Sequence, residues 1–437
     1  MILVYTHKIT PRVRYIFRHI LSKILLIPVS FTSKVEEFVA HDGPKISYTK
    51  MPLENELFIK SNDLLFEQGV NDLEISMQKW DDIPCFFATN ARSAIPFDVF
   101  AASFYLISRY EEYLPHVKDQ HGRYTATQSL AFRYRFLEKP VVDIWAFKLL
   151  KILQEKFPNY TYKKRTYKFI STIDVDNAFA YKHKSFIRSV GGFFKDLIHL
   201  KLVEVWSRLI VLLNVKNDPF DTFQKLLQLK KDLKVNTIFF FLIGDYTSFD
   251  TNVSASKKKF RLLIKDMVDY ASVGLHPSYF SSQDVVMIKK EKERLENITN
   301  MPVLRTRQHY LRFNLPETYQ ILIDLEIEED YSMGYASHVG FRAGTSIPFH
   351  FFDLDFEIQT PLLIYPFALM DTTLNDYMGL TPKQSLGRTK DLLQEVMRVK
   401  GTFITLFHNE SVSGYLRWNG WQRVYETMLK MIRKNAY

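Results

Sequence analysis

Residues 167–179, YKFISTIDVDNAF, form an apolar run that ends in two carboxylates, Asp174 and Asp176. Successive side chains of a strand point to opposite faces, so residues two apart face the same side. A buried strand that delivers acidic side chains at its carboxyl end is how α/β barrels build active sites. We therefore predict that a parallel sheet begins with this run and that its chemistry gathers at the carboxyl edge.

Segments typical of strands and of helices alternate along the rest of the chain. The apolar runs NTIFFFLIGDY (236–246), SVGLH (272–276) and GTFITLFH (401–408) are separated by amphipathic helical segments. About seven such β then α units predict a parallel sheet covered by helices. We expect residues 166–437 to form an irregular (β/α)7 TIM-like barrel with a helical insertion at about 180–215.

Residues 1–165 contain no recognisable catalytic cluster and are expected to form a smaller α+β domain of unknown role. One helical run, residues 98–114, has an apolar face formed by Phe100, Phe104, Ile107 and Tyr110. Its polar residues are Ser108, Arg109, Glu111 and Glu112. These could line a groove, but we expect them on a solvated helix face.

The chain is long and basic. Its 437 residues suffice for two domains with separate cores. Lys and Arg number 58 against 48 Asp and Glu, and the net charge of +10 permits attraction to nucleic acid, anionic lipid or an acidic polymer without selecting one. No nucleic-acid-reading motif is evident, so we expect no nucleic-acid partner. The sequence does not reveal the oligomeric state.

Cysteine content and the N-terminal segment bear on cellular location. The single cysteine, Cys85, excludes an intrachain disulfide and fits a reducing compartment. The longest clean apolar run near the N-terminus, residues 24–29, is interrupted by proline, unlike the core of a secretory signal. No stretch reaches the ~20 apolar residues that span a bilayer. We predict a cytoplasmic protein with at most peripheral membrane contact.

The predicted insertion is amphipathic. Residues 182–213 place basic and apolar side chains on different helix faces. Such helices can lie on an anionic membrane. Packing against the N-terminal domain explains the same pattern, and we favour packing.

Metal-ligating and acid–base side chains follow the predicted strands. Besides the aspartate pair, the candidates are His276, Arg307, His309 and His408. Aspartate and histidine hold Zn²⁺ or another divalent ion while leaving a position open for water. The aspartate pair alone is a weak signal, because nucleotide-sugar transferases and phosphatases use similar pairs and a strand-end acid can also serve as a cap.

The ordered motifs STIDVD, GLHPS, RQHYL, GFRAGTSIPF and LFHN resemble successive motifs of the polysaccharide deacetylase family over residues from about 167 to 430. The resemblance implies an irregular (β/α)7 barrel, a divalent cation such as Zn²⁺, and an acetylated sugar or polysaccharide precursor as substrate. The implied roles are base for Asp174, metal ligand for Asp176 and His276, orienting residue for Arg307, and acid for His408.

One position departs from the family pattern. The family's histidine motif has a second histidine four residues after the first, where this chain has Phe280. We expect His309 to replace the missing metal ligand, although a core histidine bonded to backbone is an equally good interpretation. Ser278 could contribute through its hydroxyl or through ordered water.

Residues outside these motifs have weaker assignments. Asp330 and Arg342 resemble the substrate-side loop of related deacetylases, although Arg342 could instead pair with an acid. Asp371 and Trp421 are weak candidates for lining a cleft. The leading prediction is a metal-dependent hydrolase that removes acetyl groups from a sugar. The alternative is a catalytically silent barrel that binds glycans or assembles at a membrane surface.

Overall fold

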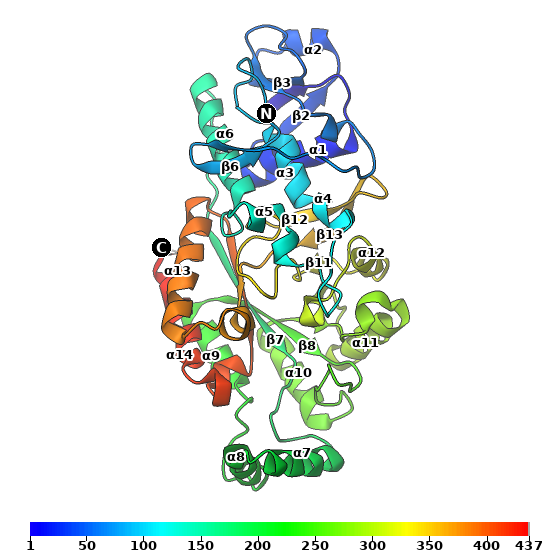
Figure 1. Cartoon of the computed structure of the whole chain (residues 1–437), viewed down its shortest axis with the longest axis vertical. Coiled ribbons are helices and arrows are strands. Elements are labelled where there is room, and N and C mark those ends of the chain that lie inside the picture. Colours follow the sequence, from blue (N-terminus) through cyan, green and yellow to red (C-terminus); the bar gives the residue numbers. More distant parts are fainter. Residues whose placement is uncertain (436–437) are drawn as a thin grey trace.

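The computed structural model describes residues 1–435, and the chain forms two parts that stack end to end (Figure 1). The N-terminal part contains a four-stranded sheet of order β2-β1-β3-β4, in which every pair is parallel. Its strands are β1 (Ile2–Tyr5), β2 (Val29–Thr32), β3 (Lys45–Thr49) and β4 (Leu57–Lys60), with a separate antiparallel hairpin of β5 (Met77–Trp80) and β6 (Ile83–Phe86). The sheet therefore has α/β character, and not the expected α+β character, because a helix connects β1 to its parallel neighbour β2.

Helices surround this first sheet. They are α1 (Pro11–Phe17), which continues as a π-helix over Arg18–Ile24, α2 (Val35–Val39), α3 (Val99–Ile107), α4 (Tyr110–Tyr113), α5 (Leu130–Arg133) and α6 (Val141–Lys156). Local sequence fixes where they begin. The hydroxyl of Thr10 accepts a hydrogen bond from the Val13 amide at the start of α1, and the Asp98 carboxylate accepts two at the start of α3.

A nine-stranded sheet of order β12-β13-β11-β10-β9-β8-β7-β15-β14 forms the second part. Its strands are β7 (Lys168–Val175), β8 (Asn236–Leu242), β9 (Ser272–His276), β10 (Arg305–Thr306), β11 (Glu329–Asp330), β12 (Phe349–Asp353), β13 (Ile358–Ile364), β14 (Leu369–Met370) and β15 (Thr402–His408). All neighbours are parallel except β12 and β13. The alternation of strands and helices predicted from the sequence is present.

The expected barrel is not closed. Within residues 1–435, no strand ladder joins β14, at one end of the sheet, to β13 at the other end of the parallel run or to β12 beyond it. Two backbone hydrogen bonds, from the Phe367 amide to the Met333 carbonyl at 3.2 Å and from the Gly340 amide to the Ala368 carbonyl at 2.8 Å, link the segment after β11 to the segment before β14 without forming a ladder. The chain therefore forms a curved, open parallel sheet, because β10, β11 and β14 span only two residues each.

The two faces of the curved sheet are both buried. Helices cover the outer face: α9 (Phe223–Leu233), α10 (Lys258–Tyr270), α11 (Val285–Thr299), α12 (Glu317–Asp324), α13 (Pro382–Arg398) and α14 (Trp421–Asn435). A separate apolar cluster that includes Ile170, Phe240, Phe367 and Ile404 fills the inner face. Side chains alternate along β7, so Asp174 lies on the same face as Ile170, above this apolar floor.

The polar residues of the 98–114 run are buried, contrary to the solvated face we expected. Arg109 bonds to Glu111 and Glu112 at 2.7 Å, and Arg342 from the second part donates two hydrogen bonds to Glu112. The run therefore packs against the second part of the chain, and the charges compensate one another where water is excluded.

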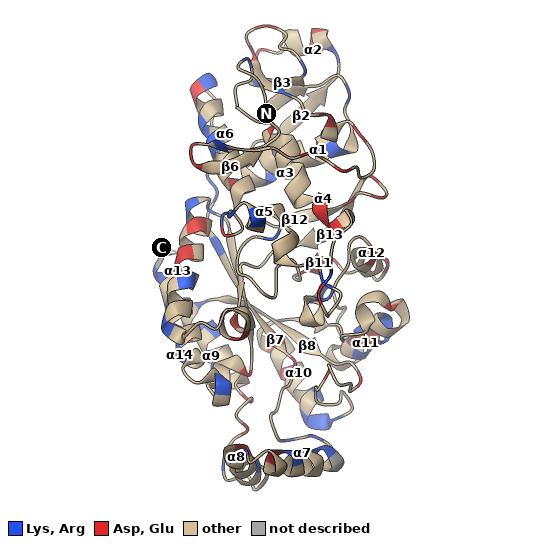
Figure 2. Cartoon of the chain, viewed as in Figure 1, with Lys and Arg blue, Asp and Glu red and all other residues tan. Residues whose placement is uncertain are grey.

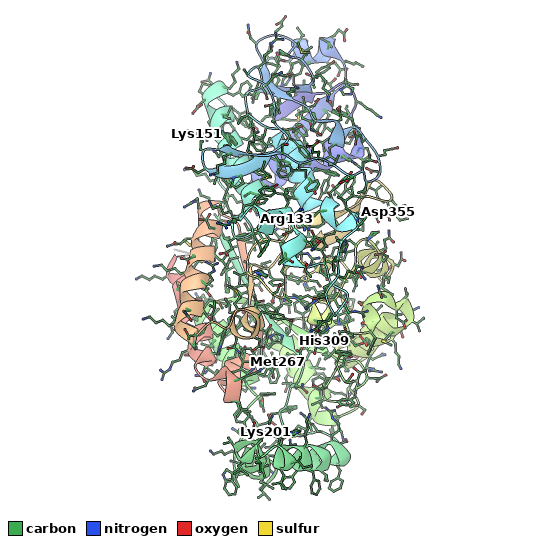
Figure 3. The ribbon with its side chains drawn as sticks, viewed as in Figure 1. Arg133, Lys151, Lys201, Met267, His309 and Asp355 are labelled. Atoms are coloured by element: carbon green, nitrogen blue, oxygen red, sulfur yellow. The ribbon has the colours of Figure 1, made fainter. Side chains whose placement is uncertain are left out.

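The insertion after β7 forms a helical hairpin of α7 (Phe186–Ile198) and α8 (Leu202–Leu212). It projects from the end of the molecule farthest from the N-terminal part (Figure 1). Figure 3 labels Lys201, between the two helices, at this end and Lys151 of α6 at the other. The expectation that the insertion packs against the N-terminal domain is therefore wrong. None of the helices described is long and apolar enough to cross a bilayer.

Candidate active site

A cavity of about 370 Å³ opens at the carboxyl edge of the parallel sheet. Its walls include Asp174, Asp176, His276, His309 and His408, which follow β7, β9, β10 and β15. Three larger cavities lie away from these side chains. One of about 650 Å³ is in the N-terminal part, one of about 800 Å³ lies between that part and the amino edge of the second sheet, and one of about 470 Å³ lies at the amino ends of β8, β9 and β10. We therefore take the smaller cavity as the candidate active site because of the carboxylates and histidines that line it, and not because of its volume.

Asp176, His276 and His309 converge on one point of this cavity. Nε2 of His276 lies 3.2 Å from Oδ1 of Asp176, and Nε2 of His309 lies 3.6 Å from Oδ2. One potential ligand atom from each residue falls within 4.8 Å of the other two. The structure thus brings together the three residues that the sequence suggested as metal ligands, and their role as ligands stays a prediction.

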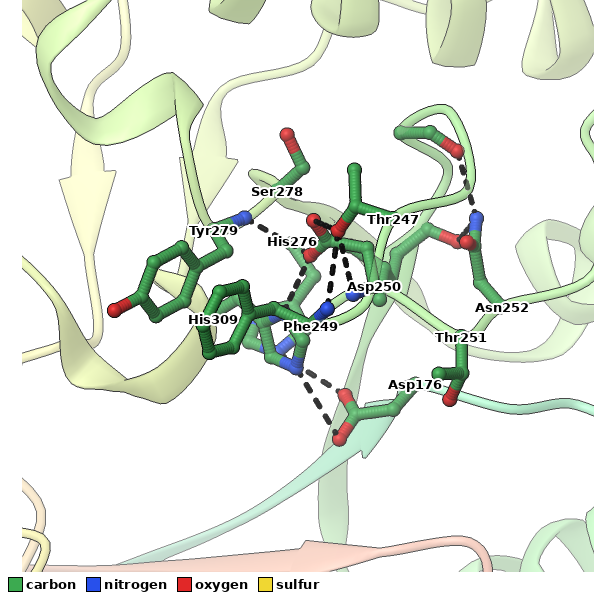
Figure 4. A network of polar contacts seen from close by, with 12 residues as sticks. Asp176, Thr247, Phe249, Asp250, Thr251, Asn252, His276, Ser278, Tyr279 and His309 are labelled. Carbon is green, nitrogen blue, oxygen red and sulfur yellow. Dashed lines mark hydrogen bonds and ion pairs between the residues drawn. The ribbon is translucent and has the colours of Figure 1, made fainter. Parts of the chain in front are cut away.

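The Nδ1 atom of each of the two histidines is fixed by a hydrogen-bond acceptor other than Asp176. Nδ1 of His276 bonds to the carbonyl oxygen of Arg307. Nδ1 of His309 bonds to Oδ1 of Asp250 at 2.8 Å (Figure 4). Because a carbonyl and a carboxylate only accept hydrogen bonds, both Nδ1 atoms carry a proton and both Nε2 atoms face Asp176. Such partners fix the ring orientation and tautomer of metal-binding histidines.

The spacing of the three donors fits a tetrahedral divalent cation. Donors about 2.0–2.1 Å from a central ion stand roughly 3.4 Å apart in a tetrahedron. The His276 separation of 3.2 Å to Oδ1 of Asp176 and the His309 separation of 3.6 Å to Oδ2 of the same carboxylate are each close to that value. Oδ1 of Asp176 is buried without a hydrogen-bond partner. The set therefore has the donor types, the spacing and the unsatisfied oxygen that a bound cation requires.

Charge in the cluster is strongly coupled. Burial lowers the pKa of His309, but the carboxylates of Asp176 and Asp250 outweigh burial and raise this pKa to about 9. Burial raises the pKa of Asp176, but His309 and His276 hold it well below its usual range. The carboxylates thus stabilise a positive charge on His309 in the form of a bound proton. A metal cation bound to the same residues would supply that positive charge instead.

Asp174 and Arg307 lie beside the three donors. Oδ2 of Asp174 is 3.8 Å from Nε2 of His276 and 4.0 Å from Nη1 of Arg307. Arg307 is fully buried, and its Nη2 donates to the Thr172 hydroxyl at 2.7 Å. Oδ1 of Asp174 and Nη1 of Arg307 have no hydrogen-bond partner. Oδ1 of Asp174 is thus available to accept a proton.

His408 faces the donors from the opposite edge of the cavity. Its Nδ1 donates to Oδ1 of Asp371 at 2.8 Å, and its amide donates to Oδ2 at 2.7 Å. Its Nε2 lies 3.7 Å from Oδ2 of Asp176. Burial lowers the pKa of His408, but Asp371 outweighs burial and raises this pKa to about 10. His408 therefore carries a proton toward the cavity at neutral pH.

Two aspartates, Asp250 and Asp371, orient site histidines through hydrogen bonds to Nδ1, and the sequence did not predict this role for either. Asp371 was a weak cleft candidate, and Asp250 was not singled out. Asp250 follows the apolar run of β8 after a short loop, and an acid beyond a parallel strand is the signal that could have found it. Its partner His309 precedes Tyr310 and Leu311, whose positive φ angles of 58° and 53° mark a sharp turn of the backbone.

The N-terminal part supplies one wall of the cavity. Arg123 lines it, donates to the Tyr310 carbonyl at 2.7 Å and pairs with Asp119. In the same segment, His121 contacts the Tyr279 hydroxyl at 3.1 Å. No role for this domain could be predicted from the sequence, because the contacts of Arg123 with Tyr310 and of His121 with Tyr279 join residues far apart in the chain.

The three predicted substrate-binding residues do not line this cavity. The Ser278 hydroxyl bonds to Glu291 at 2.5 Å. Asp330 accepts hydrogen bonds from Thr306, Tyr319 and Ser332. Arg342 pairs with Glu112, as its alternative interpretation held. Since these polar atoms already have buried partners, we assign the three residues no part in the reaction below.

Phe280 occupies the position of the family's second histidine. Its ring is 47% exposed and packs against Phe249 and Tyr279, outside the residues that line the cavity. A side chain at this position therefore points away from Asp176, and His309 takes the third place in the cluster.

Comparison with known proteins divides the chain in the same way. Residues 2–158 match a family model described as a family of unknown function (DUF7033). No curated protein sequence matches the chain. Among solved structures, the chain is similar to polysaccharide deacetylases of the CE4 family over part of its length.

Three of these structures illustrate the similarity. A Mycobacterium smegmatis protein with a provisional assignment as a polysaccharide deacetylase is 14% identical, with 63% of this chain and 86% of that chain covered and a TM-score of 0.41. The Bacillus cereus polysaccharide deacetylase Bc1974 is 13% identical (61% and 88% covered, TM-score 0.29). A CE4 family pseudoenzyme from Bacillus anthracis is 16% identical (62% and 62% covered, TM-score 0.31). At these TM-scores the similarity alone assigns neither fold nor activity.

Proposed function

We propose that the chain is a metal-dependent hydrolase that removes acetyl groups from a sugar or a polysaccharide precursor. The observation that carries the proposal is the cluster of Asp176, His276 and His309, with both Nδ1 atoms held from behind and both Nε2 atoms facing one carboxylate. Such a set leaves a coordination position open. When bound there, a divalent cation, for which Zn²⁺ suits the ligand types, supplies Lewis acidity toward an acyl oxygen and an attacking water.

The residues around the cluster divide the proton transfers between them. Asp174 takes the proton of the attacking water, and Arg307 orients this carboxylate. His408 gives its proton to the leaving nitrogen or oxygen, and Asp371 holds the imidazolium in place. Asp174 of β7 and His408 of β15 are register partners on adjacent strands, so base and acid both stand beside Asp176.

Aromatic side chains beside the cluster suit a sugar ring. Phe249, Tyr310 and Tyr377 line the cavity. The Phe249 ring stacks on Tyr279 at 4.0 Å and meets Tyr310 edge to face at 6.0 Å, so a rigid apolar wall faces the polar cluster. Flat apolar walls beside a few convergent polar groups are typical of carbohydrate-sized sites. An acetylated sugar is therefore the substrate class that we propose.

Metal analysis and acetate release test this proposal. The chain purified with added Zn²⁺ should carry one ion, and His309→Ala should lose it. The matched control, His199→Ala, changes an exposed histidine and should retain the ion. Asp174→Asn should retain the ion and the fold but release acetate from acetylated sugar oligomers at least about 100-fold more slowly.

Two outcomes would count against the enzyme. Unchanged turnover in Asp174→Asn would exclude this residue as the base. Absence of stoichiometric metal after loading would favour the alternative, a silent barrel that binds glycans without hydrolysing them.

A further inference from the structure

The α7–α8 hairpin carries apolar side chains on its solvent-facing surface. On α7 they recur every three or four residues and so form one stripe: Phe186, Val190, Phe194, Leu197 and Ile198. The outermost of these are far from buried, since Phe186 is 81% and Ile198 is 76% exposed. Single exposed apolar residues are common on protein surfaces, but a continuous apolar stripe is typical of a surface that binds another protein or a membrane.

Helix α8 extends this apolar surface. Its exposed apolar residues are Leu202, Val203, Trp206, Leu209 and Leu212. Trp206 is 66% exposed, whereas Trp145, Trp418 and Trp421 are at most 1% exposed. A large exposed tryptophan is typical of helices that lie at a membrane–water interface.

The faces that join the two helices are polar and specific. Arg208 of α8 bonds to Asp196 of α7 at 2.6 Å. Its guanidinium fits over Gly192, where an added Cβ would approach it to 2.8 Å. Helices α7 and α8 therefore pack against each other through a specific contact, and their exposed apolar residues lie outside it. These apolar residues are thus not an interface between the two helices that has become exposed.

The charge of the hairpin favours an anionic partner. Residues 182–216 contain seven Lys and Arg against two acids, Asp196 and Glu204. Asp196 is neutralised by Arg208, and most of the ribbon of α7 and α8 is otherwise apolar or uncharged (Figure 2). A second copy of the hairpin would bring the same positive charge against itself, whereas an anionic bilayer surface complements it.

The hairpin is also tied to the catalytic edge. Arg188 of α7 donates to the carbonyl oxygens of Thr251 and Asn252 at 2.7 and 2.8 Å, and Thr251 lines the cavity. The guanidinium of Arg188 stacks over the Tyr246 ring at 4.0 Å. The hairpin thus has a fixed attachment beside the loop that carries Asp250.

We propose that the α7–α8 hairpin docks on the surface of a bilayer that contains anionic phospholipid. The apolar stripes enter the boundary between headgroups and acyl chains, and the surrounding lysines contact the headgroups, because Arg188 and Arg208 are held by contacts within the protein. With 13 and 11 residues, the helices lie in the surface and do not cross it. This inference rests on the hairpin alone and is independent of the proposed hydrolase activity.

Vesicle binding of the full chain tests the proposal. The chain should sediment with vesicles of phosphatidylcholine and phosphatidylglycerol more strongly than with phosphatidylcholine alone, and added salt should weaken the difference. Trp206 fluorescence should shift to the blue and be quenched by brominated acyl chains, and Trp206→Phe should remove this signal while the chain still binds. The double variant Phe194→Ser/Trp206→Ser should bind at least about tenfold more weakly.

Phe356→Ser is the matched control, because Phe356 is also 66% exposed but lies at the β12–β13 turn. It should bind vesicles as the wild type does. Failure of the wild type to bind anionic vesicles, or equal binding by the double variant, would overturn the proposal, as would an oligomer that the double variant abolishes. Asp174→Asn should bind vesicles normally and the double variant should keep its metal, so failure of this inference and failure of the hydrolase are distinguishable.

Discussion

Asp250 accepts a hydrogen bond from Nδ1 of His309 at 2.8 Å, and this contact turns Nε2 of His309 toward Asp176. Asp250 is itself fully buried and accepts further hydrogen bonds from the Tyr279 amide and the Thr247 hydroxyl. The position of the Asp250 carboxylate is therefore fixed by contacts other than its hydrogen bond with His309. This arrangement supplies a third donor in a chain that has Phe280 in place of the family's second histidine.

Replacing the supporting aspartate should weaken metal binding. Asp250→Asn keeps the shape of the side chain but removes the charge that raises the basicity of His309, so affinity should fall about 10- to 100-fold. Titration with Zn²⁺ against a competing chelator measures the change. Asp245→Asn alters an exposed aspartate nearby and should leave the affinity unchanged. Equal affinities for the two variants would contradict the role of Asp250.

Restoring the family's histidine should not restore the metal. The double variant His309→Ala/Phe280→His should remain without bound Zn²⁺, because position 280 is half exposed and lies outside the cavity lining. Metal content after loading is the measurement. Recovery of one ion per chain would mean that residue 280 can reach Asp176 and that the third ligand has been misassigned.

Removing the proposed acid should separate chemistry from metal binding. His408→Gln should lower kcat for acetate release by about 100-fold or more, because the leaving group then departs without a positioned proton donor. Zn²⁺ content should stay at the wild-type level, since His408 does not belong to the three-donor cluster. Loss of the ion in this variant would instead make His408 a ligand. Asp371→Asn should reproduce the kcat effect in part.

The charged contact between the two parts of the chain should make stability sensitive to acid. Burial raises the pKa of Glu112, but Arg342 and Arg109 outweigh burial and lower it to about 2 from the ordinary 4.5. The unfolded chain therefore takes up the proton first as pH falls, and this stabilisation is lost progressively from about pH 4.5 downward. Urea unfolding between pH 3 and 7 should show the loss, and Glu112→Gln should reduce its pH dependence.

The same variant tests the strength of the contact at neutral pH. Glu112→Gln leaves the buried guanidinium of Arg342 without a carboxylate partner and Arg109 with Glu111 alone, so the free energy of unfolding should fall by about 3–5 kcal/mol. Glu138→Gln breaks a half-exposed pair with Arg388 and should cost less than about 1 kcal/mol. Similar losses in both variants would show that burial of the Glu112 network has no special effect.

The sequence alone determined the alternation of parallel strands and helices and the edge at which the candidate catalytic residues gather. Asp174, His276 and His408 each end or nearly end a strand, and parallel strands bring their carboxyl ends to one edge whatever the details of closure. Periodicity also placed Asp174 and Asp176 on one face. These conclusions depend on local pattern and on the geometry of parallel pairing, which any such sheet shares.

Tertiary structure alone decided how the site is completed. The turn at Tyr310 and Leu311, the support of His309 by Asp250 and the wall supplied by Arg123 join residues that are distant in the chain. Burial of Glu112 likewise required a partner from the second part, so a run that resembles a solvated helix face became an interface. A sequence pattern records the period and polarity of one element, whereas these features depend on what another element places against it.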